Sequence, residues 1–389
     1  MIIRNLLGAL AVTAMSATSS IAQEPVRIGF ITTLSGGGGY LGQDIRDGFN
    51  LFVEMNNGTL GGTPVEVLVE DDAVNPGTGR QIADRFMYDL DINLLTGIVF
   101  SNVASAVVPE VLESGAIYVS PNAAPTAFAG EGCHPNYFVL SWQNESHHEA
   151  AGVNANLLGY ERMVILAPNY VGGIDALEGF KRRFEGEVIR EIYTQLDQTD
   201  FSAEMAQIRS LAPDAVFQFH PGGLGIAFLR QYDQAGLRET IPMVVPGPSM
   251  DHAILQSAGG AAIGLNVTSQ WNDDLDNEAN HTFVSTFRER YGRMPTLYAS
   301  QGYDTAQAIG AALRLTDGRT DDVEAFRTAM LQADFPSVRG PFSFGRNQHP
   351  VQNWYSMNVE ADENGNTRLV TTGVIINEEG DHYQDRCSL

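Results

Sequence analysis

Short runs of apolar, mostly β-branched residues alternate with longer runs of helical periodicity through most of the chain, and this alternation limits the possible folds more than any other feature. Buried strands of a parallel sheet read as continuous apolar runs, and the amphipathic runs between them supply helices for both faces. The sequence therefore predicts an α/β fold built on doubly wound parallel sheets. The first series has predicted strands at 26–31, 65–69, 98–100 and 117–119, and predicted helices at 43–55, 78–90 and 103–112.

The same rhythm begins again after Ser141, so two similar α/β units follow one another. The length suits two domains of about 100–200 residues each. Because no low-complexity linker separates the units, we expect two lobes joined by short crossovers. The second series has predicted strands at 162–166, 188–193, 215–219 and 241–245, and helices at 146–158, 174–184, 201–211 and 225–235. Helices at 280–291, 301–315 and 322–331 follow, and then strand-like residues 342–376 with a turn at 362–365.

The N-terminus has the order of a secretory signal. Arg4 precedes the mostly apolar residues 6–15, and the small or polar residues 16–20 follow. Small residues at Ser20 and Ala22 predict cleavage after Ala22. The alternative is a buried N-terminal helix, but a Ser/Thr/Ala-rich stretch is a poor helix end. No later segment approaches the ~20 apolar residues of a membrane span. We therefore expect residues 1–22 to be a signal peptide, and the mature chain to be free in the periplasm rather than membrane-embedded.

The chain is strongly acidic, with a formal net charge of −24, which becomes −25 when Arg4 leaves with the signal. Such a charge repels nucleic acid and anionic membrane surfaces, so neither is an expected partner. The acidity is read as a solvated surface and says little about a ligand.

The two cysteines are Cys133, in a Gly-rich turn, and Cys387, near the C-terminus. Export permits a disulfide, and the spacings typical of zinc or redox sites are absent. We predict that the two pair and hold the tail to the body; the alternative is two free thiols. The neighbouring His147, His148 and Glu149 do not predict a metal site, because adjacent helical side chains point in different directions.

A Gly-rich loop at 35–42 joins the first strand to the first helix, and Gly37, Gly39 and Gly42 match GxGxxG. With an acid cluster at 70–72, this could indicate a dinucleotide site. The match is weak because four consecutive glycines nearly fit the pattern by themselves. The loop still leads into a helix N-terminus, and such a terminus favours a negative ligand group such as a carboxylate. No cofactor is predicted.

Several ordered segments resemble the leucine/isoleucine/valine-type solute-binding proteins of ABC transporters. They cover nearly the whole mature chain in the right order. The segments include Ile28-Gly29-Phe30, Leu34-Ser35-Gly36, Phe100-Ser101-Asn102, Val119-Ser120-Pro121-Asn122-Ala123-Ala124, Thr199-Asp200-Phe201-Ser202 and Tyr303-Asp304-Thr305-Ala306.

This resemblance implies a type I periplasmic binding fold with three crossovers and a ligand held between two lobes. By analogy, the first lobe comprises residues 25–142 and 272–348, and the second comprises 143–271 and 349–389. The implied function is capture of a small molecule and delivery to the permease of an ABC transporter, without catalysis.

The resemblance also implies site residues. Tyr40 matches an aromatic wall, Ser101 matches a serine that holds the ligand carboxylate, and Tyr170 matches a tyrosine that closes over the ligand. Ala123 and Ala124 fall on a segment whose backbone amides grip the same carboxylate. The full set of candidates is Tyr40, Ser101, Asn102, Asn122, Ala123, Ala124, Trp142, Tyr170, Phe219, His220, Ser249 and Tyr303.

Two departures from the family pattern bear on the ligand. Residues 246–249 read Pro-Gly-Pro-Ser where amino-acid binders place a glutamate for the ligand ammonium, and residues 219–223 replace a Tyr-rich loop. An unpaired buried ammonium would cost several kcal/mol. We therefore expect a carboxylate without an α-amino group, and the aromatic candidates favour an aromatic acid. Residues 141–144, Ser-Trp-Gln-Asn, together with paired terminal cysteines, resemble the aromatic-acid branch of the family.

Other classes of function remain as alternatives. A branched-chain or other amino-acid or amide binder would share the fold. An exported hydrolase would need a nucleophile, a base and an orienting group in register, and no Gly-x-Ser-x-Gly motif occurs. A sensor ectodomain would need a membrane helix or an attached signalling domain.

Overall fold

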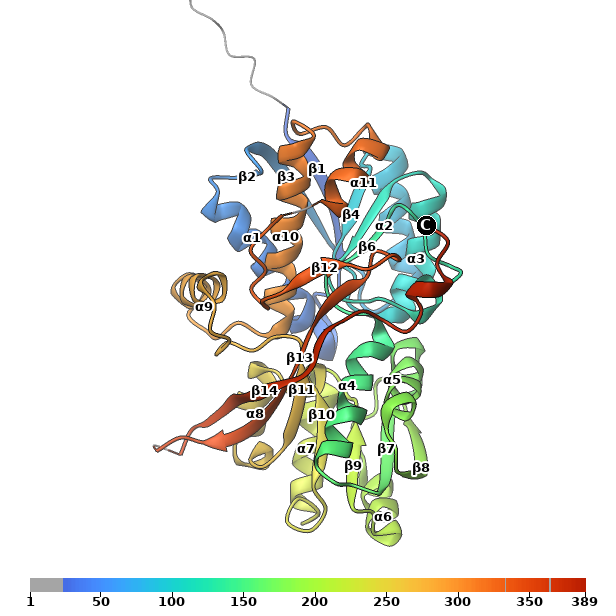
Figure 1. The fold of residues 1–389 in the computed structure, drawn as a ribbon, viewed down its shortest axis with the longest axis vertical. Coiled ribbons are helices and arrows are strands. Elements are labelled where there is room, and N and C mark those ends of the chain that lie inside the picture. The colour runs from blue at the N-terminus through green and yellow to red at the C-terminus, as the bar shows by residue number, and fades with distance from the viewer. Residues whose placement is uncertain (1–23, 333, 364) are drawn as a thin grey trace, which may run out of the picture.

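A computed structural model describes residues 24–332, 334–363 and 365–389 as two stacked α/β lobes (Figure 1). The predicted signal peptide lies outside these residues. In the first lobe the strand order is β2-β3-β1-β4-β5-β6. The strands from β3 through β6 run parallel, while β2 is an antiparallel edge strand. The strands are β1 (Val26–Thr32), β2 (Thr59–Leu60), β3 (Thr63–Asp71), β4 (Leu94–Thr96), β5 (Ile117–Ser120) and β6 (Tyr137–Val139), with helices α1 (Gly39–Met55), α2 (Pro76–Asp84) and α3 (Ser101–Glu113).

In the second lobe the strand order is β12-β13-β11-β10-β9-β7-β8, and β14 pairs with β13. Strands from β11 to β8 are parallel, whereas β12, β13 and β14 pair antiparallel. The strands are β7 (Arg162–Pro168), β8 (Glu187–Thr194), β9 (Ala215–Gln218), β10 (Met243–Pro246), β11 (Asn266–Ser269), β12 (Phe342–Phe344), β13 (Pro350–Ala361) and β14 (Thr367–Glu379). The helices are α4 (Asn144–Leu157), α5 (Val171–Arg183), α6 (Ser202–Leu211), α7 (Gly223–Gln234) and α8 (His252–Ala258).

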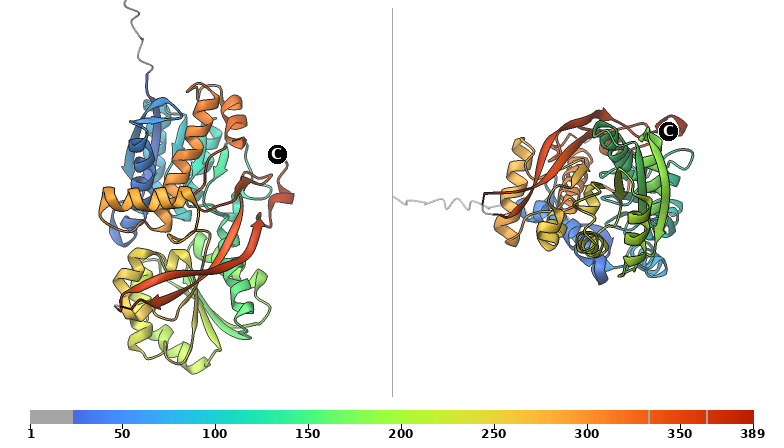
Figure 2. Two further views of the ribbon diagram at one scale, coloured as in Figure 1. Left: turned by 60° about the vertical axis from the view of Figure 1, so that its left-hand side comes forward. Right: turned by 90° about the horizontal axis from the view of Figure 1, so that it is seen from below.

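After β11 the chain returns to the first lobe as α9 (Glu278–Tyr291), α10 (Leu297–Leu315) and α11 (Val323–Leu331). Helix α10 packs tightly on α1 because glycines let the backbones approach. A Cβ at Gly48 would lie 1.9 Å from the Ala299 carbonyl oxygen, and one at Gly302 would lie 1.9 Å from that of Ile45. The β13–β14 hairpin then runs obliquely across both lobes (Figure 2).

The chain thus passes between the sheets after β6, after β11 and before β12. The predicted α/β class and the doubly wound parallel sheets are confirmed. Strand β12 hydrogen-bonds β13 of the second sheet, while its Phe344 packs against Phe138 of the first lobe. The lobe boundaries at 142, 271 and 348 remain our proposal.

Some predicted elements lie elsewhere. Residues 98–100 are not a strand; β4 ends at Thr96, Gly97 takes a φ of 112°, and the Ile98 amide donates to the Tyr118 hydroxyl. The helix predicted at 78–90 ends at Asp84 and continues as a π-helical turn, η2 (Arg85–Asp89). In the part of the chain that the structure describes, no helix is long and apolar enough to cross a membrane.

The predicted disulfide is present, joining Cys133 before β6 to Cys387 in the tail, with a Cα–Cα distance of 5.7 Å. The bond closes a segment of 254 residues. A cross-link of this kind removes conformational freedom from the unfolded chain, and more so for long loops.

We expect replacement of both cysteines by serine to lower the free energy of unfolding by about 2–4 kcal/mol. Urea denaturation of the double variant, followed by circular dichroism, measures this. Reduced wild-type protein is the matched control and should unfold at the same urea concentration as the double variant. Equal stability of oxidised wild type and variant would contradict the expectation.

Candidate functional site

An enclosed cavity lies where the two lobes meet, at the C-terminal ends of the parallel strands. The space open to the centre of a water molecule is about 30 Å³, whereas one water needs roughly 10–15 Å³. The cavity therefore has room for a few waters and is too small for a dinucleotide. Its lining contains no Asp, Glu, Lys or Arg. The lining residues are Leu41, Val99, Phe100, Ser101, Asn122, Ala123, Trp142, Asn144, His148, Tyr170, Gly172, Phe219, Pro221, Pro248 and Tyr298.

One end of the cavity is formed by helix N-termini. Ser101 is the first residue of α3, and Gly172 lies in the first turn of α5. The first amides of a helix have no intrahelical acceptor, and the helix dipole adds positive potential there. The Ser101 Oγ accepts a hydrogen bond from Asn144 Nδ2 at 3.0 Å, so its own proton is available to a ligand. This end can bind a carboxylate.

Asn144 links the two lobes at that end. Its Nδ2 also donates to Asp175 Oδ2 at 2.8 Å, and its Oδ1 accepts from the Ala124 amide at 3.1 Å. Burial raises the pKa of Asp175 to about 6, although the Asn144 hydrogen bond opposes that rise. A titratable carboxyl therefore lies one side chain away from the predicted carboxylate position.

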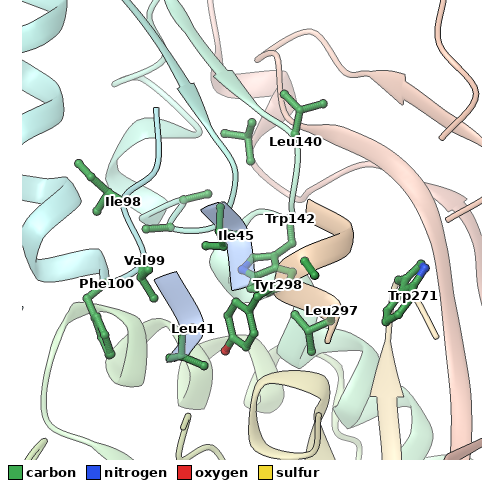
Figure 3. Close-up of a cluster of buried hydrophobic side chains, with 14 of the residues drawn as sticks. Leu41, Ile45, Ile98, Val99, Phe100, Leu140, Trp142, Trp271, Leu297 and Tyr298 are labelled. Atoms are coloured by element: carbon green, nitrogen blue, oxygen red, sulfur yellow. The ribbon is translucent and has the colours of Figure 1, made fainter. Parts of the chain in front are cut away.

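Aromatic side chains line the cavity. Figure 3 shows Phe100, Trp142 and Tyr298 within a cluster of buried hydrophobic side chains. Tyr170 stacks with Phe219 at 6.4 Å between ring centroids and lies 6.3 Å from Phe100. Trp142 and Tyr298 complete the lining from the crossover and from α10, and the Tyr298 hydroxyl points toward Leu41 in the view shown. The hydroxyls of Tyr170 and Tyr298 make no hydrogen bond to any residue that the structure describes. A flat aromatic group suits such walls.

The structure brings six of the predicted residues to the cavity: Ser101, Asn122, Ala123, Trp142, Tyr170 and Phe219. Asn122 is held by a hydrogen bond from its Nδ2 to the Val99 carbonyl oxygen at 2.7 Å. The amides expected to grip a carboxylate are already engaged. That of Ala123 donates to the Ile98 carbonyl oxygen at 3.3 Å and that of Ala124 to Asn144, so neither amide is free to bind a carboxylate.

The other predicted residues lie away from the lining. The Tyr40 hydroxyl donates to Asp251 Oδ2 of the second lobe at 2.8 Å. Tyr40 also lines a separate open groove of about 620 Å³ at the outer edge of the lobe boundary. Tyr303 faces the core of the first lobe, against Phe52 and Phe283. Asn102 reaches the Val74 carbonyl oxygen at 3.5 Å.

His220 and Ser249 form a buried network behind the cavity wall. The His220 ring nitrogens lie 3.0 Å from Thr194 Oγ1 and 2.8 Å from Gln218 Oε1, and its amide donates to Ser249 Oγ at 2.8 Å. Burial lowers the pKa of His220 to about 3. This histidine is neutral and its side chain is fully occupied by the protein.

Three polar lining residues were missed from the sequence: Asn144, His148 and Tyr298. Asn144 ends the Ser-Trp-Gln-Asn segment already noted at the crossover, so its position was a usable signal. His148 stands in the run His147-His148-Glu149, which carries no signal for a ligand-binding residue. Tyr298 was missed because α10 begins at Leu297, four residues before the predicted start, with Thr296 accepting from the Tyr298 amide as its cap.

The Gly-rich loop packs against the second lobe instead of opening onto a ligand. The Gly37 carbonyl oxygen lies 3.2 Å from the Cβ position of Gly222 and 3.1 Å from that of Gly223. At Gly42 a Cβ would lie 2.0 Å from the Thr33 carbonyl oxygen. These glycines serve close packing.

Comparison with known proteins gives one family. A family model described as periplasmic binding protein matches residues 25–366. Among curated relatives, "Leu/Ile/Val-binding protein homolog 6" of Brucella melitensis is 26% identical over 369 residues, covering 92% of this chain and 93% of the relative.

Solved structures agree with the family match. A solute-binding protein of an ABC transporter from R. palustris, in complex with benzoate, is 30% identical with a TM-score of 0.88, covering 94% of this chain and 100% of that one. A second solute-binding protein of an ABC transporter, from Rhodopseudomonas palustris BisB5 in complex with 3,4-dihydroxybenzoic acid, is 26% identical with a TM-score of 0.85. The match covers 92% of this chain and 99% of that one.

Proposed function

This chain belongs to the periplasmic binding protein family, and from that membership we propose that its solute is a small aromatic carboxylate without an α-amino group. The chain is a periplasmic solute-binding protein of an ABC transporter, a class that binds and delivers without catalysis. The exported-hydrolase alternative is thereby set aside.

The charge pattern of the cavity carries the proposal. One end offers the Ser101 hydroxyl and helix N-termini to an anion, while the lining holds no carboxylate for an ammonium. The buried carboxyl of Asp251 lies outside the lining and is engaged by Tyr40 and by two amides at the start of α8. An amino acid would have to bury its ammonium without a partner, at a cost of several kcal/mol.

The walls support an aromatic ring, because Phe100, Tyr170 and Phe219 present apolar faces to a small enclosed space. The related proteins solved with benzoate and 3,4-dihydroxybenzoic acid agree with this choice. The alternative is a branched-chain amino acid, which the names of the Brucella relatives favour.

We further propose that the ligand is captured by lobe closure. Hydrogen bonds between Ser101 and Asn144, and between Tyr40 and Asp251, join residues of the two lobes. A ligand that contacts both lobes binds the closed arrangement better and shifts the population toward it. Residues 1–22 are proposed to leave after export, with cleavage after Ala22.

A thermal-shift panel on ligand-stripped mature protein tests the function. Benzoate and 4-hydroxybenzoate at 100 times Kd should stabilise the folded state by about 2.7 kcal/mol, while leucine, isoleucine and valine should give no shift. Strong stabilisation by leucine or valine, with none by the aromatic acids, would overturn the proposal.

Binding of the acid is expected to weaken as pH rises from about 5.5 to 7.5. Burial raises the pKa of Asp175 to about 6, and the neighbouring carboxylate of Glu145 raises it further. A bound carboxylate beside Asn144 repels ionised Asp175, so the ligand favours the protonated form, which is lost above this pKa. A shift of one pKa unit on binding corresponds to about tenfold in Kd.

Calorimetric titration with benzoate at several pH values measures this dependence. The Asp175→Asn variant is the matched control and should bind with the same affinity across the range. Tighter binding at high pH, or an unchanged slope in the variant, would contradict the assignment.

A further inference from the structure

His148 is one of the polar side chains of the cavity lining that the described part of the chain leaves without a hydrogen-bond partner. It is 4% exposed, lines the cavity from α4, and its Nδ1 is buried with no hydrogen bond. Neither ring nitrogen bonds to any residue within the described part of the chain. Both nitrogens of buried His220 have partners. His147 has a partner on one nitrogen, where Nε2 accepts from the Gly247 amide at 3.2 Å, while its Nδ1 is buried without one. Buried polar groups are normally satisfied, so His148 is an exception that needs a partner.

The imidazole lies among aromatic rings of the second lobe. Its centroid is 4.7 Å from that of Phe219 and 5.9 Å from that of Phe217, both at steep angles. Burial lowers its pKa well below the ordinary value, and neighbouring His147 adds to this. A neutral imidazole has one N–H donor and one acceptor nitrogen.

The spacing on α4 places His148 relative to the carboxylate end. Asn144, which bonds Ser101, and His148 are four residues apart on one helix, so they share a face and are separated by about 6 Å along the axis. That separation is comparable to the length of a benzoate from its carboxyl carbon to its para substituent. A ring held at Ser101 and lying along this face directs its far end toward His148.

We propose that His148 hydrogen-bonds a hydroxyl at the end of the ligand ring opposite the carboxylate, and so makes the protein selective for ring-hydroxylated aromatic acids over benzoate. This inference rests on the proposed function, which requires only an aromatic acid. It adds the ring hydroxyl as the recognised substituent and His148 as the residue that binds it.

Calorimetric dissociation constants for benzoate, 4-hydroxybenzoate and 2-hydroxybenzoate test the proposal. Wild-type protein should prefer 4-hydroxybenzoate over benzoate about tenfold, the effect of one buried hydrogen bond. The 2-hydroxyl lies beside the carboxylate and cannot reach His148, so 2-hydroxybenzoate should show no such preference. In His148→Leu the ratio of the first two constants should fall to near one.

Tyr298→Phe is the matched comparison, because it removes another unpartnered group of the lining that could bond the same hydroxyl. If Tyr298→Phe removes the preference and His148→Leu keeps it, the assignment to His148 is overturned. Equal affinity of wild type for both acids overturns the selectivity itself. If no aromatic acid binds wild type, the proposed function fails and this inference fails with it.

If His148→Leu does not fold, NMR of the wild-type protein tests the same proposal. The imidazole 15N shifts of His148 in wild-type protein should move on addition of 4-hydroxybenzoate and should move much less with benzoate. Identical shifts with the two acids would overturn the proposal.

Discussion

Replacing Ser101 by aspartate is expected to abolish binding of the aromatic acid, weakening Kd by at least about 100-fold. The new carboxylate would lie at the start of α3, where the ligand carboxylate is proposed to bind. The two negative charges would therefore repel each other. Two like charges 4 Å apart repel by about 4 kcal/mol at an effective dielectric constant of 20. The affinity is measured by calorimetric titration with benzoate and 4-hydroxybenzoate.

Two controls separate repulsion from loss of structure. An acid in the first turn of a helix is favourable, so Ser101→Asp should melt no earlier than the ligand-free wild type. Ser101→Ala removes one charge-assisted hydrogen bond and should weaken binding only about tenfold or somewhat more. Binding by Ser101→Asp within tenfold of wild type would place the carboxylate elsewhere.

Replacing Asp304 by asparagine is expected to lower the free energy of unfolding by about 3–5 kcal/mol, because it leaves a buried arginine without its counter-charge. Arg339 is 2% exposed, and its Nε donates to Asp304 Oδ2 at 3.1 Å. Its Nη1 donates to the Ser141 carbonyl oxygen at 3.0 Å and to Gln352 Oε1 at 2.9 Å. The ion pair therefore ties α10 to two of the segments that cross between the lobes.

The double variant Asp304→Asn with Arg339→Met is the matched control. It removes the unpaired buried charge and keeps an amide oxygen that can accept from the Val338 amide, so its loss of stability should be clearly smaller than that of Asp304→Asn alone. Chemical denaturation of wild type and the variants measures the difference. An Asp304→Asn variant as stable as wild type would show that the charge of Asp304 is not needed.

The fold could be predicted from the sequence because buried parallel strands read as apolar runs between amphipathic helices. The prediction was wrong at 98–100, where an apolar run leaves the sheet after Gly97 and leads into α3. Apolar character signals burial, and it does not tell a strand from a buried loop.

The candidate site could be predicted only in part, since a sequence places residues at strand ends without fixing the direction of each side chain. Tyr298 and Tyr303 both lie on α10, and five residues rotate a side chain by about 140° around a helix. Tyr298 therefore faces the cavity while Tyr303 packs against Phe283 in the core. The direction depends on where α10 begins and on how it packs against α1, and both depend on contacts distant in sequence.

The central claim is that the cavity binds a carboxylate and has no partner for an α-ammonium. Phenylacetate and phenylglycine differ only by that ammonium, so their calorimetric dissociation constants on ligand-stripped protein test the claim most directly. We predict that phenylacetate binds at least about 100-fold more tightly, since a buried unpaired ammonium costs several kcal/mol. Equal or tighter binding of phenylglycine would contradict the claim and would return amino acids as the solute.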